Sequence, residues 1–354
     1  MTGLTGSMQP SFDLIDRFVA AEGVPAAALA IAHRGEIIAT HFAGEAVPGR
    51  AAGAETLWPL ASISKLYTAA TILTLVERGA IALATPVRSV LPDFDGDGRE
   101  QATIRHLLTH TAGVIYEPPD MVDVLKAQTP LAAMVDLLYR APLRYPPGEG
   151  QAYSDLGYAL LGRIATAVTG TPFPALVQEL VLTPAGLHDT TLAPDAAQTA
   201  RAARVVGAMA AGTAGAMYNS PYALALGHPA FGVLASVADL ARFALCFAPG
   251  GRPFLSAATV QAMTTDQTGD AITCSGVRPW GLGFEIKNSD FPSLASPGSY
   301  GHGGATGCLV WIDPVYEVVV AFVSTRHYNA DPLGFELRQE CLLNTVLASL
   351  TRGG

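Results

Sequence analysis

The chain has 354 residues, of which half are hydrophobic and 14% are charged, so it can bury a substantial core and is not intrinsically disordered. Its net charge of −9 argues against nucleic acid and anionic membrane surfaces as partners. The N-terminus has no basic region and no apolar run, so we expect a cytoplasmic protein without a signal peptide. Reduced thiols are favoured over a disulfide framework or a zinc site by the wide spacing of Cys246, Cys274, Cys308 and Cys341.

The first part of the chain predicts a helix followed by two strands. We expect residues 1–10 to form a disordered tail, and the spacing of apolar residues over 11–22 predicts a helix. The apolar runs 24–33 and 36–42, separated by a turn at Gly35, predict a β-hairpin. An Ala- and Gly-rich linker then leads to the segment on which the functional interpretation depends.

Residues 60–76 form a strongly apolar segment with Ser62 and Lys65 at its beginning, and Pro59 before it and Gly79 after it predict a buried helix. Burial disfavours the charged form of an amine, and the i,i+3 spacing places the two side chains on one face. Ser62 and Lys65 therefore have the pattern of a nucleophile with its base. This spacing also arises by chance, and the alternative is that Ser62 is only a helix N-cap.

Two histidines, His106 and His110, lie at i and i+4, a spacing that can hold a metal ion on one helix face. No glutamate stands between them as a zinc protease would need. We therefore favour a short structural helix that ends at Gly113, and predict no metal site.

The rest of the chain shows no internal repeat, and its helical, loop-like and β-type segments differ in composition. Helical patterns occupy 122–140 and 155–169, whereas 193–230 is rich in Ala, Gly and Thr and predicts a long loop that could cover the site. The last third returns to β character and closes with a helix: strands are expected at 281–287, 306–312 and 317–325, and the helix at 333–350.

Strands at both ends of the chain and helices in its middle predict an α+β fold rather than alternating βαβ units. In this interpretation residues 11–56 and 275–350 together build a sheet domain flanked by helices. Residues 57–274 form a large, mostly helical insertion.

A second motif, Tyr153-Ser154-Asp155, stands at the start of the helix expected at 155–169. A tyrosine can relay protons where a nearby ammonium favours its phenolate. The alternative is that Tyr153 is an ordinary core aromatic.

The third motif is the glycine-rich stretch 301–307, which contains His302 and is expected to open a strand. Four glycines in seven residues let a ligand approach the backbone closely, and a backbone amide there can complete an oxyanion hole. The alternative is a glycine-rich turn with a solvated histidine. A dinucleotide-binding loop is excluded because no helix follows.

The order Ser-x-x-Lys, Tyr-Ser-x and His-Gly-Gly resembles the serine β-lactamase and penicillin-binding-protein superfamily. It is most similar to the class C β-lactamase-like group, which includes family VIII carboxylesterases, D-aminopeptidases and acyltransferases. The resemblance covers about residues 11–350. It includes the further stretches 107–113, 145–148, 232–236 and 280–284.

This resemblance implies a β-lactamase/transpeptidase-like fold with an antiparallel sheet, and a role for each motif. Ser62 would be the acylated nucleophile, and Lys65 and Tyr153 would share the proton transfers. The amides of Ser62 and Ala305 would form the oxyanion hole. His302 would occupy the position of the lysine in the K-T-G motif. No metal or organic cofactor is implied.

Two departures from the family pattern bear on the substrate. Asp155 replaces the usual asparagine of the middle motif, where an amide would donate to the substrate's acylamide carbonyl. His302 and Gly303 replace Lys-Thr, and a mostly neutral imidazole binds a carboxylate more weakly than an ammonium does. We expect substrate contacts from Asp155, Gly303, Gly304, Tyr116 and Trp280. Further aromatic candidates for the pocket rim, each of which could also be plain core, are Trp58, Tyr218, Phe284 and Tyr328.

The resulting hypothesis is a serine hydrolase that forms an acyl-enzyme at Ser62 and acts on small esters with short or medium acyl groups. The alternatives are a β-lactamase, a D-amino-acid peptidase or carboxypeptidase acting on an amide, and an acyltransferase. A non-catalytic sensor that traps an acyl group remains a fourth possibility. The sequence does not indicate an oligomeric state.

Overall fold

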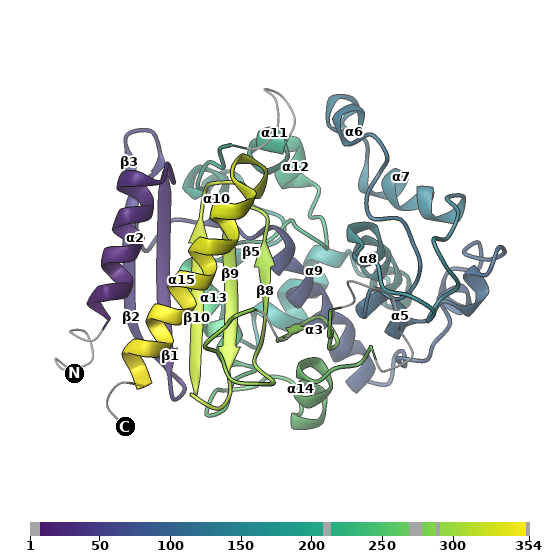
Figure 1. The fold of residues 1–354 in the computed structure, drawn as a ribbon. Helices are drawn as coiled ribbons and strands as arrows, with labels where there is room; N and C mark the ends of the chain where they lie inside the picture. The colour runs from purple at the N-terminus through teal and green to yellow at the C-terminus, as the bar shows by residue number, and fades with distance from the viewer. Residues whose placement is uncertain (1–7, 208–213, 269–277, 288–290, 352–354) are drawn as a thin grey trace.

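The computed structural model describes residues 8–207, 214–268, 278–287 and 291–351. A seven-stranded antiparallel sheet in the order β3-β2-β1-β10-β9-β8-β7 combines strands from both ends of the chain (Figure 1). The expected α+β fold is therefore confirmed. The strands are β1 (Ala26–His33), β2 (Glu36–Val47), β3 (Arg50–Ala51), β7 (Glu285–Ile286), β8 (Tyr300–Gly304), β9 (Cys308–Asp313) and β10 (Val318–Ser324).

The centre of the sheet is buried on both faces. β1 pairs with β10 in antiparallel register from Ala27 opposite Ser324 to His33 opposite Val318. Both strands are almost continuously apolar, as strands covered on both sides are. Helices α2 (Gln9–Ala21) and α15 (Pro332–Thr351) cover one face of the sheet and contact each other there (Figure 1). α13 (Val237–Leu245) packs on the other face.

The helical region between the two groups of strands surrounds α3 (Ser64–Glu77) and α8 (Asp155–Thr169). Residues on nearly every face of α3 are buried, which confirms the predicted core helix. A small sheet in the order β4-β6-β5 also lies in this region, with β4 at Trp58–Pro59, β5 at Thr190–Thr191 and β6 at Leu234–Ala235. The other α-helices are α4 (Val87–Val90), α5 (Ile104–Leu108), α6 (Met121–Ala127), α7 (Leu131–Asp136), α9 (Phe173–Val177), α10 (Ala196–Arg201), α11 (Ala214–Asn219), α12 (Pro221–Ala225) and α14 (Ala257–Thr264).

Three expectations need correction. The tail predicted over 1–10 is wrong at its end, because Met8 is fully buried and α2 begins at Gln9; residues 1–7 lie outside the described part. The loop predicted at 193–230 contains α10, α11 and α12, although residues 208–213 are also outside the described part. The glycine-rich motif 301–307 was expected to open a strand. Instead, its first residues form the end of β8, and the next strand, β9, begins only after the motif, at Cys308.

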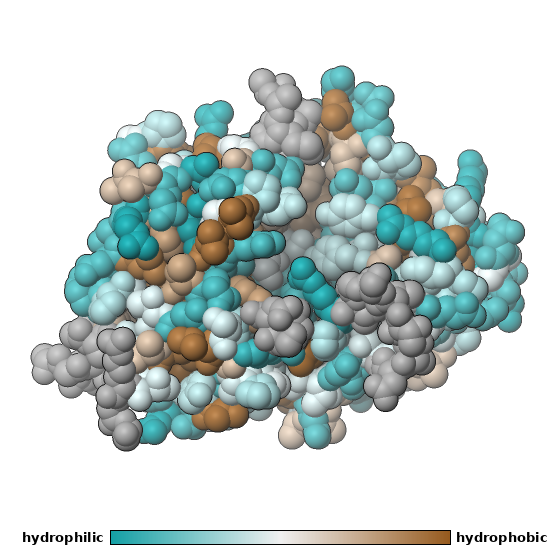
Figure 2. Space-filling view, in the orientation of Figure 1, coloured by the Kyte–Doolittle hydropathy of each residue, from teal (hydrophilic) through white to brown (hydrophobic). Residues whose placement is uncertain are grey.

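The face of the molecule seen in Figure 2 is mainly polar. Figure 2 shows a face covered largely by hydrophilic side chains, with apolar ones in small groups between them, as is normal for a folded domain. Among the described residues no single helix is long and apolar enough to cross a membrane, and one pair of helices reaches that length only across an 84° bend.

Candidate active site

Ser62 lies in a short 3₁₀ turn, Ala61–Ile63, that leads into α3. Ala61 adopts a left-handed backbone conformation with φ of +47°, a strained state that the surroundings must hold in place. Two hydrogen bonds from Val233 do so: its carbonyl accepts from the Leu60 amide at 3.0 Å, and its amide donates to Ser64 Oγ at 2.9 Å. The N-cap position of α3 is Ile63 and Ser62 lies inside the preceding turn, so Ser62 is not the cap of this helix.

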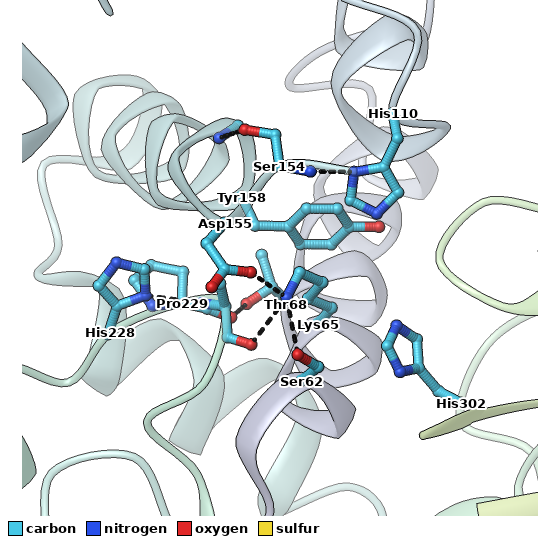
Figure 3. A network of polar contacts seen from close by, with 12 residues as sticks. Ser62, Lys65, Thr68, His110, Ser154, Asp155, Tyr158, His228, Pro229 and His302 are labelled. Atoms are coloured by element: carbon cyan, nitrogen blue, oxygen red, sulfur yellow. Dashed lines mark hydrogen bonds and ion pairs between the residues drawn. The ribbon is translucent and has the colours of Figure 1, made fainter. Parts of the chain in front are cut away.

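Lys65 is fully buried, and its amine points to three oxygen atoms (Figure 3). Nζ lies 3.3 Å from Ser62 Oγ, 2.6 Å from Asp155 Oδ1 and 3.2 Å from the Ala230 carbonyl. Three acceptors match the three N–H groups of an ammonium. The structure thus brings Ser62 and Lys65 together as predicted.

Tyr153 packs its ring against the same amine, with Lys65 Nζ 4.4 Å from the ring centroid. Burial and the nearby Asp155 carboxylate raise the pKa of Tyr153 well above its usual value, and a hydrogen bond with Ser62 opposes this only in part. For Lys65 the effect of burial has the opposite sign: burial lowers the pKa of the amine, and the Asp155 carboxylate raises it in part. Because Asp155 offsets the charge of Lys65, the ammonium does not favour a phenolate here, and Tyr153 is a neutral phenol.

His110 proves more important than its sequence pattern indicated. Its Nδ1 accepts a hydrogen bond from the Ser154 amide at 3.1 Å, its carbonyl accepts one from Ala152 at 2.9 Å, and its ring lies 4.4 Å from that of Tyr153. Burial lowers the pKa of His110 well below its usual value, so the imidazole is neutral and can accept at Nδ1. His106 instead accepts from Thr103 in a capping box at the start of α5. Both histidines therefore have structural partners of their own.

The His302 side chain lies on β8 with Nδ1 2.6 Å from the Gly303 carbonyl, so Nδ1 carries the proton and Nε2 is the unprotonated nitrogen. Burial lowers the pKa of His302 to about 3, which keeps the ring neutral. The described structure provides no hydrogen-bond partner for the buried Nε2. The predicted neutral imidazole at this position thus has a defined tautomer.

The end of β8 lies directly against the segment before Ser62. A Cβ atom on Gly304 would stand 2.3 Å from the Leu60 carbonyl oxygen, so only glycine fits without a shift. Thr306 Oγ1 donates to the Pro59 carbonyl at 2.6 Å, and the Ala305 carbonyl accepts from the Tyr328 amide at 2.7 Å. Ser62 and Ala305 line one cavity as a result, the arrangement that an oxyanion hole between their amides requires.

This cavity has a volume of about 450 Å³. Trp280 stands between two of its histidines, with its ring centroid 4.9 Å from that of His110 and 5.4 Å from that of His302. Sequence reasoning had not singled out Gln151, Arg278, Glu285 and Phe335, which also contribute to the wall. The lining residues are Ser62, His110, Gln151, Tyr153, Arg278, Trp280, Glu285, His302, Gly303, Gly304, Ala305, Tyr328 and Phe335.

Several residues that were predicted to contact the substrate are not among the described residues that line the cavity. The side chain of Asp155 is buried against Lys65 rather than open to the cavity. Tyr116 is not among the described residues that line the cavity, and the nearby Asp155 carboxylate together with burial raises the pKa of its hydroxyl. Trp58 and Phe284 are completely buried core residues, and Tyr218 packs against Ala61 and Val205. Of the predicted aromatic contacts, Trp280 and Tyr328 reach the cavity wall.

Comparison with known proteins identifies the family. The chain matches the family model Beta-lactamase over residues 12–340. The chain belongs to the β-lactamase family. It is 32% identical to penicillin-binding protein 4 of Amycolatopsis lactamdurans over 298 residues. The matched segment covers 80% of this chain and 75% of that protein.

Two further similar proteins, one found by sequence and one by structure, are an esterase and a hydrolase. This β-lactamase-family chain is 36% identical over 176 residues to esterase EstB of Burkholderia gladioli, or 45% of each chain. The solved structure of EstCE1, a hydrolase with promiscuous acyltransferase activity, matches with a TM-score of 0.82 over 96% of this chain and 98% of that one, at 20% identity. The structural likeness supports the fold, and the sequence relatives support a serine hydrolase.

Proposed function

We propose that this serine hydrolase is a carboxylesterase that acts on neutral esters with short or medium acyl groups. The observation that carries this proposal is the Asp155–Lys65 ion pair. It engages the Asp155 side chain of the middle motif with Lys65, so this side chain is not free to bind the substrate. An asparagine amide at that position would be a donor for an acylamide carbonyl, whereas a carboxylate only accepts.

The rest of the cavity supports the same substrate class. His302 is neutral, because burial lowers its pKa to about 3, so it offers no charge to a substrate carboxylate. The cation among the described lining residues, Arg278, is ion-paired with Glu285 at 2.9 Å. An uncharged ester therefore suits this cavity better than a β-lactam or a peptide stem with a free carboxylate.

The proposed reaction uses the groups in the order in which they meet the substrate. Ser62 Oγ attacks the ester carbonyl carbon while its proton passes to the unprotonated amine of Lys65. The amides of Ser62 and Ala305 hold the oxyanion, and the phenol of Tyr153 donates a proton to the departing alcohol, which it regains from Lys65. Water then attacks the acyl-enzyme by the reverse path, which releases the acid and restores the Ser62 hydroxyl.

Hydrolysis of p-nitrophenyl acetate, p-nitrophenyl butyrate and a chromogenic cephalosporin tests this proposal. We expect turnover of both esters that exceeds turnover of the cephalosporin, and its loss in Ser62→Ala. Ser89→Ala, which changes an exposed serine, is the matched control. Full ester turnover by Ser62→Ala would exclude Ser62 as the nucleophile, and strong cephalosporin turnover without ester turnover would exclude the esterase.

Penicillin-binding protein 4 as a relative favours a second candidate, a β-lactamase or D-amino-acid peptidase. The cephalosporin arm of the same experiment distinguishes it. A stoichiometric burst of p-nitrophenol without further turnover would instead indicate an acyl-trapping sensor.

A further inference from the structure

The Asp155 carboxylate is placed by the backbone as well as by its ion pair. Its own amide donates to the Tyr116 carbonyl at 2.9 Å, and the Leu156 amide donates to the same oxygen at 3.1 Å. The neighbouring Ser154 caps α8 through the Gly157 amide at 2.9 Å. Asp155 therefore enters the site from a fixed helix start, and its side chain has only 8% of its surface exposed.

We propose that Asp155 is a positioning residue for the hydrolysis. It acts through Lys65, holding Nζ against Ser62 and setting the pH below which the nucleophile is not activated. This inference rests on the proposed acyl-enzyme chemistry at Ser62. It assigns to Asp155 a role different from the substrate contact that its place in the motif suggests.

Charged and titratable groups approach Lys65 from every element around it. Three are histidines, and burial lowers the pKa of each: His228 and His302 to about 3, and His110 well below its usual value. The tyrosines have raised pKa values and are neutral. Among the described residues these groups are Ser62, His110, Tyr153, Asp155, Tyr158, His228 and His302, with Tyr116 and Glu117 beyond Asp155.

Among these groups in the described structure, Asp155 is the one that forms an ion pair with Lys65. Glu117 forms no ion pair with Lys65 in the described structure, and burial together with the Asp155 carboxylate raises its pKa. The charge state of Lys65 therefore responds chiefly to two opposed influences, its burial and Asp155. Replacing Asp155 by a neutral side chain leaves burial unopposed.

The proton positions follow from the same three contacts. As an ammonium, Lys65 donates to Asp155, to the Ala230 carbonyl and to Ser62 Oγ, so it cannot accept the serine proton. After losing one proton, the amine keeps two donors for Asp155 and Ala230 and turns its lone pair to the Ser62 hydroxyl. When the Ser62 Oγ–carbon bond forms, the serine proton moves to Nζ and restores the ammonium beside Asp155.

Loss of the carboxylate therefore has two opposite effects. The pKa of Lys65 falls, since the group that raised it is gone, so the reactive amine persists to lower pH. At the same time the ammonium formed during attack loses its counter-ion, and Lys65 becomes a weaker base. A residue with a merely structural role would lower activity without moving the pH at which activity is lost.

The test is the pH profile of kcat/KM for p-nitrophenyl butyrate in the wild type and in Asp155→Asn. We expect the acidic limb to move to lower pH by about one unit or more, with a lower plateau. The matched control is Asp239→Asn, because Asp239 is also buried and pairs with Arg242 at 2.7 Å outside the lining of the cavity. That variant should lose stability while keeping the wild-type midpoint. An unchanged midpoint in Asp155→Asn would overturn the proposal.

A second measurement separates this inference from the proposed function. Labelling of Ser62 by a fluorophosphonate requires an activated nucleophile but no particular substrate, so its rate is measured across the same pH range. A shift of the labelling midpoint supports the role of Asp155 even if no ester is turned over, and an unshifted midpoint overturns it even if esters are good substrates. Asp155→Ser, a smaller neutral replacement, serves for both measurements if Asp155→Asn does not fold.

Discussion

The inner end and the outer end of the cavity differ in how firmly they are held. At the inner end, Lys65 and Asp155 are buried and bonded to several partners, and the backbone around Ser62 is fixed by Val233. At the outer end, Arg278 and Tyr328 are exposed to solvent and few hydrogen bonds restrict their side chains. From this difference we infer that the reaction depends on a rigid group of atoms at the inner end. Substrate choice depends on outer side chains that can be substituted with little loss of stability.

Lys65→Ala should have the largest effect, because it removes the base and leaves the Asp155 carboxylate buried without its ion-pair partner. We expect kcat/KM to fall at least about a thousandfold, together with a lower Tm. The double variant Lys65→Ala/Asp155→Asn should recover Tm but not activity. Recovery of activity, or no loss of Tm in the single variant, would show that the inner end is not held in the way described.

Gly304→Ala tests how closely β8 must approach the serine turn. The added Cβ would meet the Leu60 carbonyl oxygen at 2.3 Å, so the Ala305 amide should shift and kcat/KM should fall about a hundredfold. Gly303→Ala is the matched control, since the nearest atoms to its Cβ lie 4.0 Å away. Equal activity in the two variants would mean that the approach of β8 does not matter for the reaction.

The buried histidines make the inner end sensitive to acid. His228 packs beside Ala230, and its pKa falls from 6.5 to about 3 on burial, so between these values the unfolded chain binds more protons than the folded one. Stability must then fall as the pH falls, by about 1.4 kcal/mol for each pH unit and each such histidine. Thermal unfolding across this range should show a shallower decline in His228→Asn than in the wild type. The exposed His188→Asn should leave the decline unchanged.

Phe335→Ala should have the smallest effect, because it changes only the outer wall of the cavity. We expect the ratio of butyrate to acetate turnover to change about threefold, without a large change in Tm. Leu337→Ala, on an exposed part of the same helix, should leave the ratio as it is. A loss of all activity in Phe335→Ala would contradict the proposed division between the two ends.

The sequence was sufficient for the fold class and for the elements that carry Ser62, Lys65 and Tyr153. A continuous apolar run between Pro59 and Gly79 marks α3, a helical pattern marks α8, and the β1–β2 hairpin follows from two apolar runs around a glycine. The strand β8 was not recognised, because a stretch of glycines and one histidine has little intrinsic preference for a strand and is held there by its pairing with β9.

Side-chain partners were harder to predict than elements. Asp155 was recognised as an unusual carboxylate, but its partner Lys65 is 90 residues away in the chain, and no local pattern joins the two. His110 was interpreted only as part of a short helix, because its bond to the Ser154 amide depends on how two loops meet. Arg278 and Glu285 carry no motif, and only the folded cavity reveals them.

The pairing of β1 with β10 also has a consequence for biosynthesis. The ribosome makes the Ser62 turn early and β8, β9 and β10 late, so Ala305 can join Ser62 in the wall of the cavity only after these strands have joined the sheet. A nascent chain therefore carries its nucleophile for most of its synthesis without the strand needed to stabilise an oxyanion. In the proposed mechanism, hydrolysis can begin only when the last strands have been added, so the order of synthesis itself keeps the unfinished enzyme inactive.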